Sequence, residues 1–172
     1  MKTSEWYEVV DSSEPLLQGD FINKCPVIIP PNKLLEGGNL DVKVETYNII
    51  VMSQSCDLVA GKIHNVLVCP YWPLEDVGIY KDRKLRESLR IGGQSGAHLL
   101  NKSSIKDLEN DFLVVDFKNI YGIGIDLIKE IAKGNGKRLR LMSPYKEHLS
   151  QAFARFFMRV GLPSDIPPFA KG

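Results

Sequence analysis

The residue types best suited to chemistry lie close together in the chain, between positions 53 and 64. Cys56, Asp57 and His64 are the types from which a thiol nucleophile, an orienting acid and a general base are assembled. Lys62 lies among them and could stabilise a thiolate or an oxyanion. Cys56, Asp57 and His64 are therefore candidate catalytic residues. The alternative is structural, because a cysteine beside a hairpin commonly packs as a small apolar side chain and an aspartate commonly caps a turn.

Two apolar runs flank this loop and must hold it in place. Residues 49–52 are Ile-Ile-Val-Met and residues 66–69 are Val-Leu-Val-Cys, and both runs are short and rich in β-branched side chains. Continuous apolar runs of this length are typical of strands that are covered on both faces. The stretch from Tyr47 to Trp72 therefore predicts a β-hairpin, with the polar loop at one end of the strands and Tyr71-Trp72 at the other.

The spacing of the cysteines argues against a metal centre. In a hairpin, Cys69 would lie opposite about Ile49, six or seven residues from Cys56, which is about 20 Å at ~3.3 Å per residue. A single ion cannot bridge that distance, and Cys25 and His64 add no closely spaced pair of ligands. We predict no metal and no cofactor.

Charge is distributed unevenly along the chain although the net charge is only +1. Residues 1–20 hold five acidic residues against one lysine, and residues 137–159 hold six basic residues against one glutamate. Such a basic end could contact RNA or a protein partner, or the two ends could pair with one another or be solvated. The candidate binding residues are Lys62, Tyr71, Trp72, Arg138, Arg140, His148, Arg155 and Arg159.

The order of the expected elements indicates one α+β domain spanning residues 1–172. Strands come first, a helical insertion follows at about residues 74–102, further strands come at about 110–142, and a helix closes the chain at about 144–160. Ser143 is expected as the N-cap of that last helix, with Pro144 as its first residue and Gly161 after its end. The strands of residues 16–72 and 110–142 predict a small antiparallel SH3-like β-barrel rather than a doubly wound sheet.

Three expectations complete this description of the barrel. Pro26 interrupts the apolar run that follows Phe21, so this strand is expected at a sheet edge or at a bulge. Residues 75–90 are expected to be helical, with a basic and mainly solvated face. Residues 137–142 alternate basic and apolar side chains, which predicts a half-exposed strand.

Composition predicts a cytoplasmic protein that does not cross a membrane. The chain is 44% hydrophobic and 25% charged, as in ordinary globular domains. Its first residues are polar and acidic where a secretory signal would be apolar, and no apolar run approaches the length of a membrane helix. Its three cysteines, without a Cys-x-x-Cys spacing, fit a reducing compartment.

A family resemblance appears at the residues of the hairpin and just before them. Gly19-Asp20 leads into a strand, and Ile-Ile-Val-Met-Ser at 49–53 is followed by Val-Leu-Val-Cys-Pro at 66–70. This order resembles the PemK/MazF family of small SH3-like barrels over about half of the chain. Gln18-Gly19-Asp20 together with residues 53–57, Ser-Gln-Ser-Cys-Asp, also resembles a "QGD … SQ-CD" signature of uncharacterised bacterial proteins.

The resemblance to PemK/MazF proteins implies RNA cleavage, but the residues that the activity requires are different here. The family usually has an arginine just before the first hairpin strand, where this chain has Thr46 and Tyr47. It usually has a threonine or serine after the proline that ends the second strand, where this chain has Tyr71-Trp72. Because a ribonuclease needs a base and a phosphate-binding donor, the resemblance implies the fold more strongly than the activity.

Two functions remain as expectations. The first is a binding or assembly module of a bacterial toxin-like or phage-defence system, which contacts a protein partner of that system or RNA. The alternative is an endoribonuclease or other hydrolase that uses the loop of residues 53–64. A homodimer is an option in either case.

Overall fold

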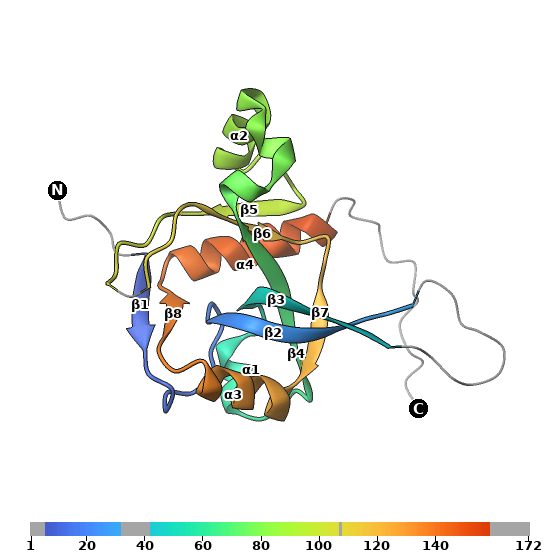
Figure 1. Ribbon diagram of the computed structural model, residues 1–172, viewed down its shortest axis with the longest axis vertical. Coiled ribbons are helices and arrows are strands. Elements are labelled where there is room, and N and C mark those ends of the chain that lie inside the picture. The colour runs from blue at the N-terminus through green and yellow to red at the C-terminus, as the bar shows by residue number, and fades with distance from the viewer. Residues whose placement is uncertain (1–5, 32–41, 107, 159–172) are drawn as a thin grey trace, which may run out of the picture.

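The computed structural model describes residues 6–31, 42–106 and 108–158. Within these residues the fold is mixed α+β, with antiparallel strands and four α-helices (Figure 1). The helices are α1 (Ser55–Val59), α2 (Arg83–Arg90), α3 (Ile125–Gly134) and α4 (Tyr145–Phe157), and two short 3₁₀ helices, η1 (Leu74–Asp76) and η2 (Gly78–Lys81), precede α2. The predicted α+β class is confirmed.

The strands form two antiparallel sheets. The smaller sheet pairs β1 (Tyr7–Val10) with β8 (Arg138–Leu141), which joins the first strand of the described chain to the last strand, just before α4. The larger sheet has the order β2 (Phe21–Ile29), β3 (Lys43–Val51), β4 (Asn65–Pro73), β6 (Leu113–Asp116) and β5 (Ala97–Leu100). The remaining strand, β7 (Tyr121–Gly124), pairs with the first half of β4.

The predicted hairpin is present as β3 and β4, with α1 in the connection between them. Cys69 lies opposite Ile50, one residue from the predicted partner. Neighbouring residues of β3 pack into different cores, since Ile50 belongs to one apolar cluster and Ile49 and Val51 belong to another. The hairpin is therefore covered on both faces, as its continuous apolar runs predict.

No sheet closes into a barrel among the described residues. β2 is one end of the strand path and β5 is the other, and β7 pairs with β4 off this path. β2 and β7 line a shared apolar groove of about 360 Å³. Pro26 pairs with Thr46 on β3, and the outer edge of β2 beside it has no named strand as a partner. A proline has no N–H for a ladder, which fits the predicted edge position. The register of β2 also shifts between Ile22 and Cys25, so the strand is bulged as well.

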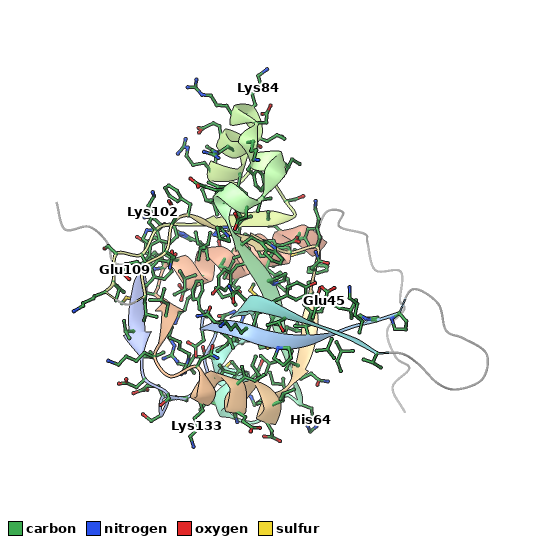
Figure 2. The ribbon with its side chains drawn as sticks, in the orientation of Figure 1. Glu45, His64, Lys84, Lys102, Glu109 and Lys133 are labelled. Atoms are coloured by element: carbon green, nitrogen blue, oxygen red, sulfur yellow. The ribbon has the colours of Figure 1, made fainter. Side chains whose placement is uncertain are left out.

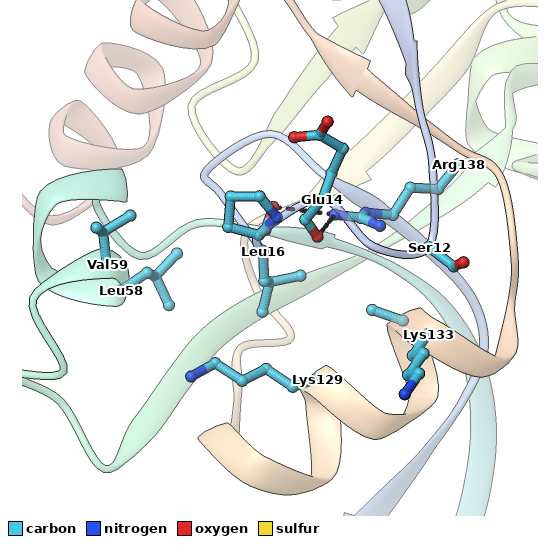
Figure 3. Close-up of a pocket in the computed structure, with 10 residues that line it drawn as sticks. Ser12, Glu14, Leu16, Leu58, Val59, Lys129, Lys133 and Arg138 are labelled. Atoms are coloured by element: carbon cyan, nitrogen blue, oxygen red, sulfur yellow. Dashed lines mark hydrogen bonds between the residues drawn. The ribbon is translucent and has the colours of Figure 1, made fainter.

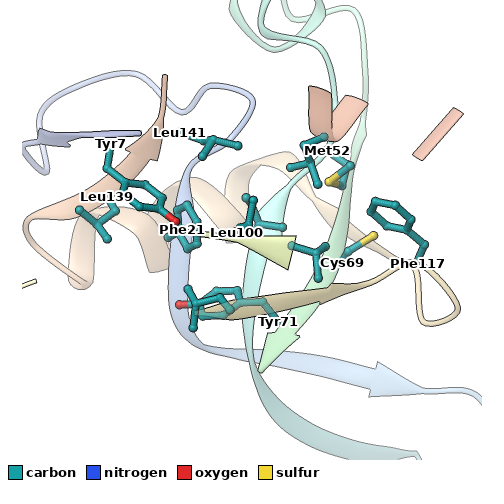
Figure 4. Close-up of a cluster of buried hydrophobic side chains, with 13 residues drawn as sticks. Tyr7, Phe21, Met52, Cys69, Tyr71, Leu100, Phe117, Leu139 and Leu141 are labelled. Atoms are coloured by element: carbon teal, nitrogen blue, oxygen red, sulfur yellow. The ribbon is translucent and has the colours of Figure 1, made fainter. Parts of the chain in front are cut away.

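The larger apolar cluster lies between the two sheets and α4 (Figure 4). Tyr7 and Leu141 from the small sheet meet Phe21 and Tyr71 from the large sheet there, and the Phe21 ring makes edge contacts with both tyrosine rings. Phe117, which follows β6, packs against Phe153 and Phe156 of α4. This cluster holds the C-terminal helix on the strands.

Residues 74–102 were expected to form a helical insertion, and most of them project from the large sheet. Residues 75–90 do not form one helix, because η1 and η2 occupy residues 74–81 and α2 begins only at Arg83. Asp82 is the N-cap of α2, and its carboxylate accepts from the N–H groups of Lys84 and Leu85. Residues 97–100 form strand β5, so the predicted insertion ends in the sheet.

One further prediction needs correction in the second half of the chain. The four residues of β8 are all buried, so the prediction of a half-exposed strand with outward arginines is wrong. Helix α3 precedes β8 and ends at Gly134.

The last helix is present, with different ends. Pro144 is the N-cap of α4 rather than its first residue, and the Ser143 hydroxyl instead donates to the Glu147 carboxylate at 2.8 Å. The helix ends at Phe157, and the stop predicted at Gly161 lies outside the described residues. In the described part of the chain, no helix has the length and apolar content needed to span a membrane.

The packing of α4 leads to a test of stability. Phe117 is fully buried where it packs against α4, whereas Phe157 of α4 is 60% exposed. We expect Phe117→Ala to lower the free energy of unfolding by about 3–5 kcal/mol, because it removes a large ring and leaves a cavity. Phe157→Ala is the matched control and should change it by less than about 1 kcal/mol. Urea denaturation followed by circular dichroism measures both, and equal losses would contradict this account of the core.

Candidate functional site

The two halves of the "QGD … SQ-CD" signature meet in the structure. The Gln18 side-chain amide donates to the Met52 carbonyl at 2.8 Å, and the Gln18 backbone N–H donates to the Ser55 hydroxyl at 3.1 Å. The Ser53 hydroxyl accepts from the Leu67 N–H at 2.9 Å. The serines of the loop thus hold the chain before β2, the end of β3 and the start of α1 together. Their polar atoms are used for structure.

Asp20, the last residue of the QGD motif, is fully buried between two arginines of β8. Its carboxylate accepts from Nε of Arg138 at 2.9 Å and from Nε and Nη2 of Arg140. Arg138 also donates to the carbonyls of Asp11, Glu14 and Pro15, each at 3.0 Å. A buried charge needs both an opposite charge and filled hydrogen bonds, and this network supplies them.

Arg138 and Arg140 were expected to bind a nucleic acid or a partner, and the structure places both inside the molecule. They are 3% and 8% exposed, and Arg140 makes one further, longer contact with Glu8. Neither guanidinium is available to a phosphate group. These two arginines instead fit the alternative in which the acidic and basic ends of the chain pair with one another.

The three candidate catalytic residues do not form a catalytic set. Cys56 and Asp57 are neighbours on α1, and the exposed thiol of Cys56 lies 3.8 Å from an Asp57 oxygen. His64 is exposed at the start of β4, where its side chain points away from the body of the molecule (Figure 2). No hydrogen bond in the described part of the chain joins His64 to Cys56 or Asp57. Lys62 is exposed on the same connection.

The positions where this chain differs from the PemK/MazF pattern are occupied by aromatic contacts. Tyr47, which stands where an arginine was expected, meets Trp72 edge to face at 5.5 Å and stacks on Tyr121 at 5.8 Å. Trp72 is partly buried, and Tyr71 is buried with its hydroxyl donating to Asn23 at 2.6 Å. Tyr71 therefore belongs to the core and is not a contact surface.

Two further candidate binding residues lie on the exposed face of α4. His148 and Arg155 are both exposed and lie two helical turns apart on one side of α4. Within the described residues, neither of them takes part in an ion pair with an acidic side chain. Phe157 and Met158 are exposed at the end of the helix. Arg159 lies outside the described residues.

Sequence reasoning missed one residue of this face. His98 on β5 stacks on Phe117, and burial, followed by the positive charges of His148 and Arg155, lowers its pKa to about 4. Three basic side chains from β5 and α4 therefore lie near one another. Only the strand pairing of β5 could have revealed this, because residues 97–100 carry too short a pattern to place His98 beside α4.

A polar groove runs along the other flank of α4. It has a volume of about 380 Å³ and lies between the start of α1 and the first half of α4. Its lining includes Gln18, Cys56, Lys146, Glu147 and Gln151. We define the α4 surface as this groove together with His98, His148, Arg155, Phe157 and Met158.

The described residues contain no group of three or more histidine, cysteine or acidic side chains that could hold a metal ion. No protein-family model matches the chain, and no curated protein matches it. The resemblance to PemK/MazF proteins therefore stays a prediction from the residues.

The buried carboxylate of Asp20 leads to the second test. Asp20→Asn leaves two buried arginines without a negative partner, and we expect it to lower the free energy of unfolding by about 3–5 kcal/mol. Glu8→Gln removes the outer carboxylate near Arg140, and it should cost less than about 1 kcal/mol because that contact is long and exposed. Chemical denaturation measures both, and a neutral effect of Asp20→Asn would contradict a structural role for the network.

The lowered pKa of His98 leads to the third test. The folded protein binds the His98 proton only near pH 4, whereas an unfolded chain binds it below the ordinary histidine pKa of 6.5. The stabilisation by neutral His98 is therefore present above pH 6.5 and is lost as the pH falls through 4, by about 1–3 kcal/mol. In urea denaturation at several pH values, His98→Phe should flatten this dependence. His64→Asn is the control, and an equal flattening there would contradict the assignment.

Proposed function

We propose that the chain is a binding or assembly module of a bacterial toxin-like or phage-defence system, built on a PemK/MazF-like, SH3-like barrel. Its α4 surface contacts the phosphate backbone of RNA. The observation that carries this proposal is the pair of exposed residues His148 and Arg155, which lie on one side of α4 and take part in no ion pair in the described part of the chain.

The cationic and aromatic side chains of α4 suit RNA better than an uncharged partner. Cationic side chains along a helix neutralise phosphates, and bases stack on nearby aromatic side chains without regard to sequence. Arg155 supplies the permanent charge, and Phe157, 60% exposed on another face of the helix, supplies a ring near the helix end. His148 also contacts the Tyr145 ring, which limits the freedom of its imidazole.

The arrangement of the loop of residues 53–64 supports RNA binding without cleavage. A ribonuclease would need a base near a cation, and His64 lies apart from both Cys56 and the α4 surface. The hydrolase alternative has one observation in its favour: the exposed thiol of Cys56 opens into the same groove as Lys146. It therefore stays as the second candidate, in which Cys56 is the nucleophile.

The proposal predicts RNA binding that depends on α4. Fluorescence anisotropy with a labelled single-stranded RNA should show an affinity that falls as salt rises, because bound phosphates release counterions. His148→Ala with Arg155→Ala should weaken binding by about 10-fold or more at low salt, the loss of one or two charged contacts. Arg83→Ala with Lys84→Ala on α2 is the control, since it removes two cationic side chains from a helix outside the α4 surface.

Three results would separate the alternatives. Absence of binding at low salt, or binding that the α4 variant leaves unchanged, would overturn the RNA proposal and favour a protein partner. Cleavage of the RNA that Cys56→Ser abolishes would favour the hydrolase. RNA that stays intact while bound would support the module.

A further inference from the structure

Two surfaces outside the α4 surface have complementary charge and shape. The first is a pocket between α1, α3 and the segment before β2 (Figure 3). Leu16, Leu58 and Ala132 form its buried apolar floor, and Val59 is 68% exposed beside them. We call it the α1–α3 pocket.

Two lysines give this pocket its charge. Lys129 and Lys133 lie one turn apart on α3 and both line the pocket, with side chains that extend in different directions in Figure 3. No ion pair within the described residues involves either of them. Arg138 also lines the pocket, but its guanidinium is taken by Asp20 and by backbone carbonyls. The Glu14 carboxylate points away from the lysines in Figure 3.

The size of the pocket favours one or two protein side chains over a small molecule. Its volume is about 310 Å³, at the lower end of the range for sites that enclose ligands. Apolar side chains that fill such pockets act as anchors in protein interfaces, and charged groups around them set the orientation. The fitting partner therefore carries an exposed apolar side chain next to carboxylates.

The second surface has that chemistry. Glu75, Asp76 and Ile79 are exposed on η1 and η2, and the Ile79 side chain is 58% exposed. We call these three residues the η1–η2 tip. Neither carboxylate takes part in an ion pair in the part of the chain that the structure describes.

The η1–η2 tip is held in a fixed conformation. Leu74 and Tyr80, on either side of it, are buried against Leu89 and Val114. The Tyr80 N–H donates to the Val77 carbonyl at 2.9 Å, and the Tyr80 carbonyl accepts from Nε of Arg86 at 2.9 Å. A preorganised surface loses little freedom on binding.

We propose that the η1–η2 tip of one copy docks into the α1–α3 pocket of a second copy. Ile79 packs on Val59 and Leu58, and Glu75 and Asp76 face Lys129 and Lys133. The projection that carries the tip and the helices that form the pocket lie at opposite ends of the molecule (Figure 1), so one copy cannot satisfy its own pocket. Two different patches make a contact that closes reciprocally in an antiparallel pair of copies or continues head to tail into a ring or an open chain.

The contact is small, so the association is weak. Interfaces well below the standard size of about 1,600 Å² belong to the transient class. Assembly should then appear only at high protein concentration, and it should weaken with salt because the lysines and carboxylates are exposed.

Charge reversal with mixing tests the proposal. Sedimentation equilibrium of the full chain should show a weight-average mass that rises at least ~1.5-fold between about 10 µM and about 1 mM, the range of weak association. Lys129→Glu with Lys133→Glu reverses the pocket, and Glu75→Lys with Asp76→Lys reverses the tip. Each variant alone should stay monomeric, and an equimolar mixture of the two should regain the concentration dependence, because each tip then meets a pocket of opposite charge.

The controls make a negative result decisive. Lys106→Glu with Lys118→Glu makes the same change of charge at exposed lysines outside both surfaces and should associate like the wild type. Ile79→Asp removes the apolar anchor and should abolish association in wild-type and mixed samples. A wild-type chain that stays monomeric up to about 1 mM, or a mixture that stays monomeric, would overturn the proposal. Far-ultraviolet circular dichroism of each variant confirms that the fold is retained at these exposed positions.

Discussion

The buried carboxylate of Asp20, held between the guanidinium groups of Arg138 and Arg140, is the interaction on which the rest of the fold depends. Three charged side chains in the interior would be strongly unfavourable if any one of them lacked a partner. Here both arginines donate to Asp20, and backbone carbonyls of residues 11–15 accept their remaining N–H groups. The network therefore fixes the segment before β2 on β8, and with it the small sheet on the large one.

That junction also positions the loop that carries the chemical residue types. Gly19 has a φ of 85°, which favours glycine, and a Cβ there would lie 3.1 Å from the Leu141 Cβ. The close approach lets Gly19 bond to both Val51 and Leu141 and directs Gln18 toward Ser55. Because the polar atoms of the signature hold strands together, the signature specifies a structural junction. Binding is then a property of the surfaces that the junction leaves exposed.

The parts of the fold that follow from local pattern were predictable from the sequence, and the parts that depend on distant partners were not. The β3–β4 hairpin and α3 each follow from a continuous or periodic run. β8 alternates arginine and leucine, which is typical of a half-exposed strand, and only the presence of Asp20 across the junction makes burial of its arginines favourable. For the candidate site, His148 and Arg155 could be found on α4, whereas His98 required the pairing of β5 with β6.

The burial of the two arginines changes what the charge of the chain can do. The basic end looked able to create a broad positive field, but Arg138 and Arg140 are neutralised in the interior, and Glu147 lies among the cations of α4. A field that acts over a Debye length of about 8–10 Å cannot be built from so few exposed charges. Under the proposed function, attraction of RNA would therefore come from short-range contacts at His148 and Arg155. Recognition of that kind depends on the geometry of those two side chains more than on long-range steering.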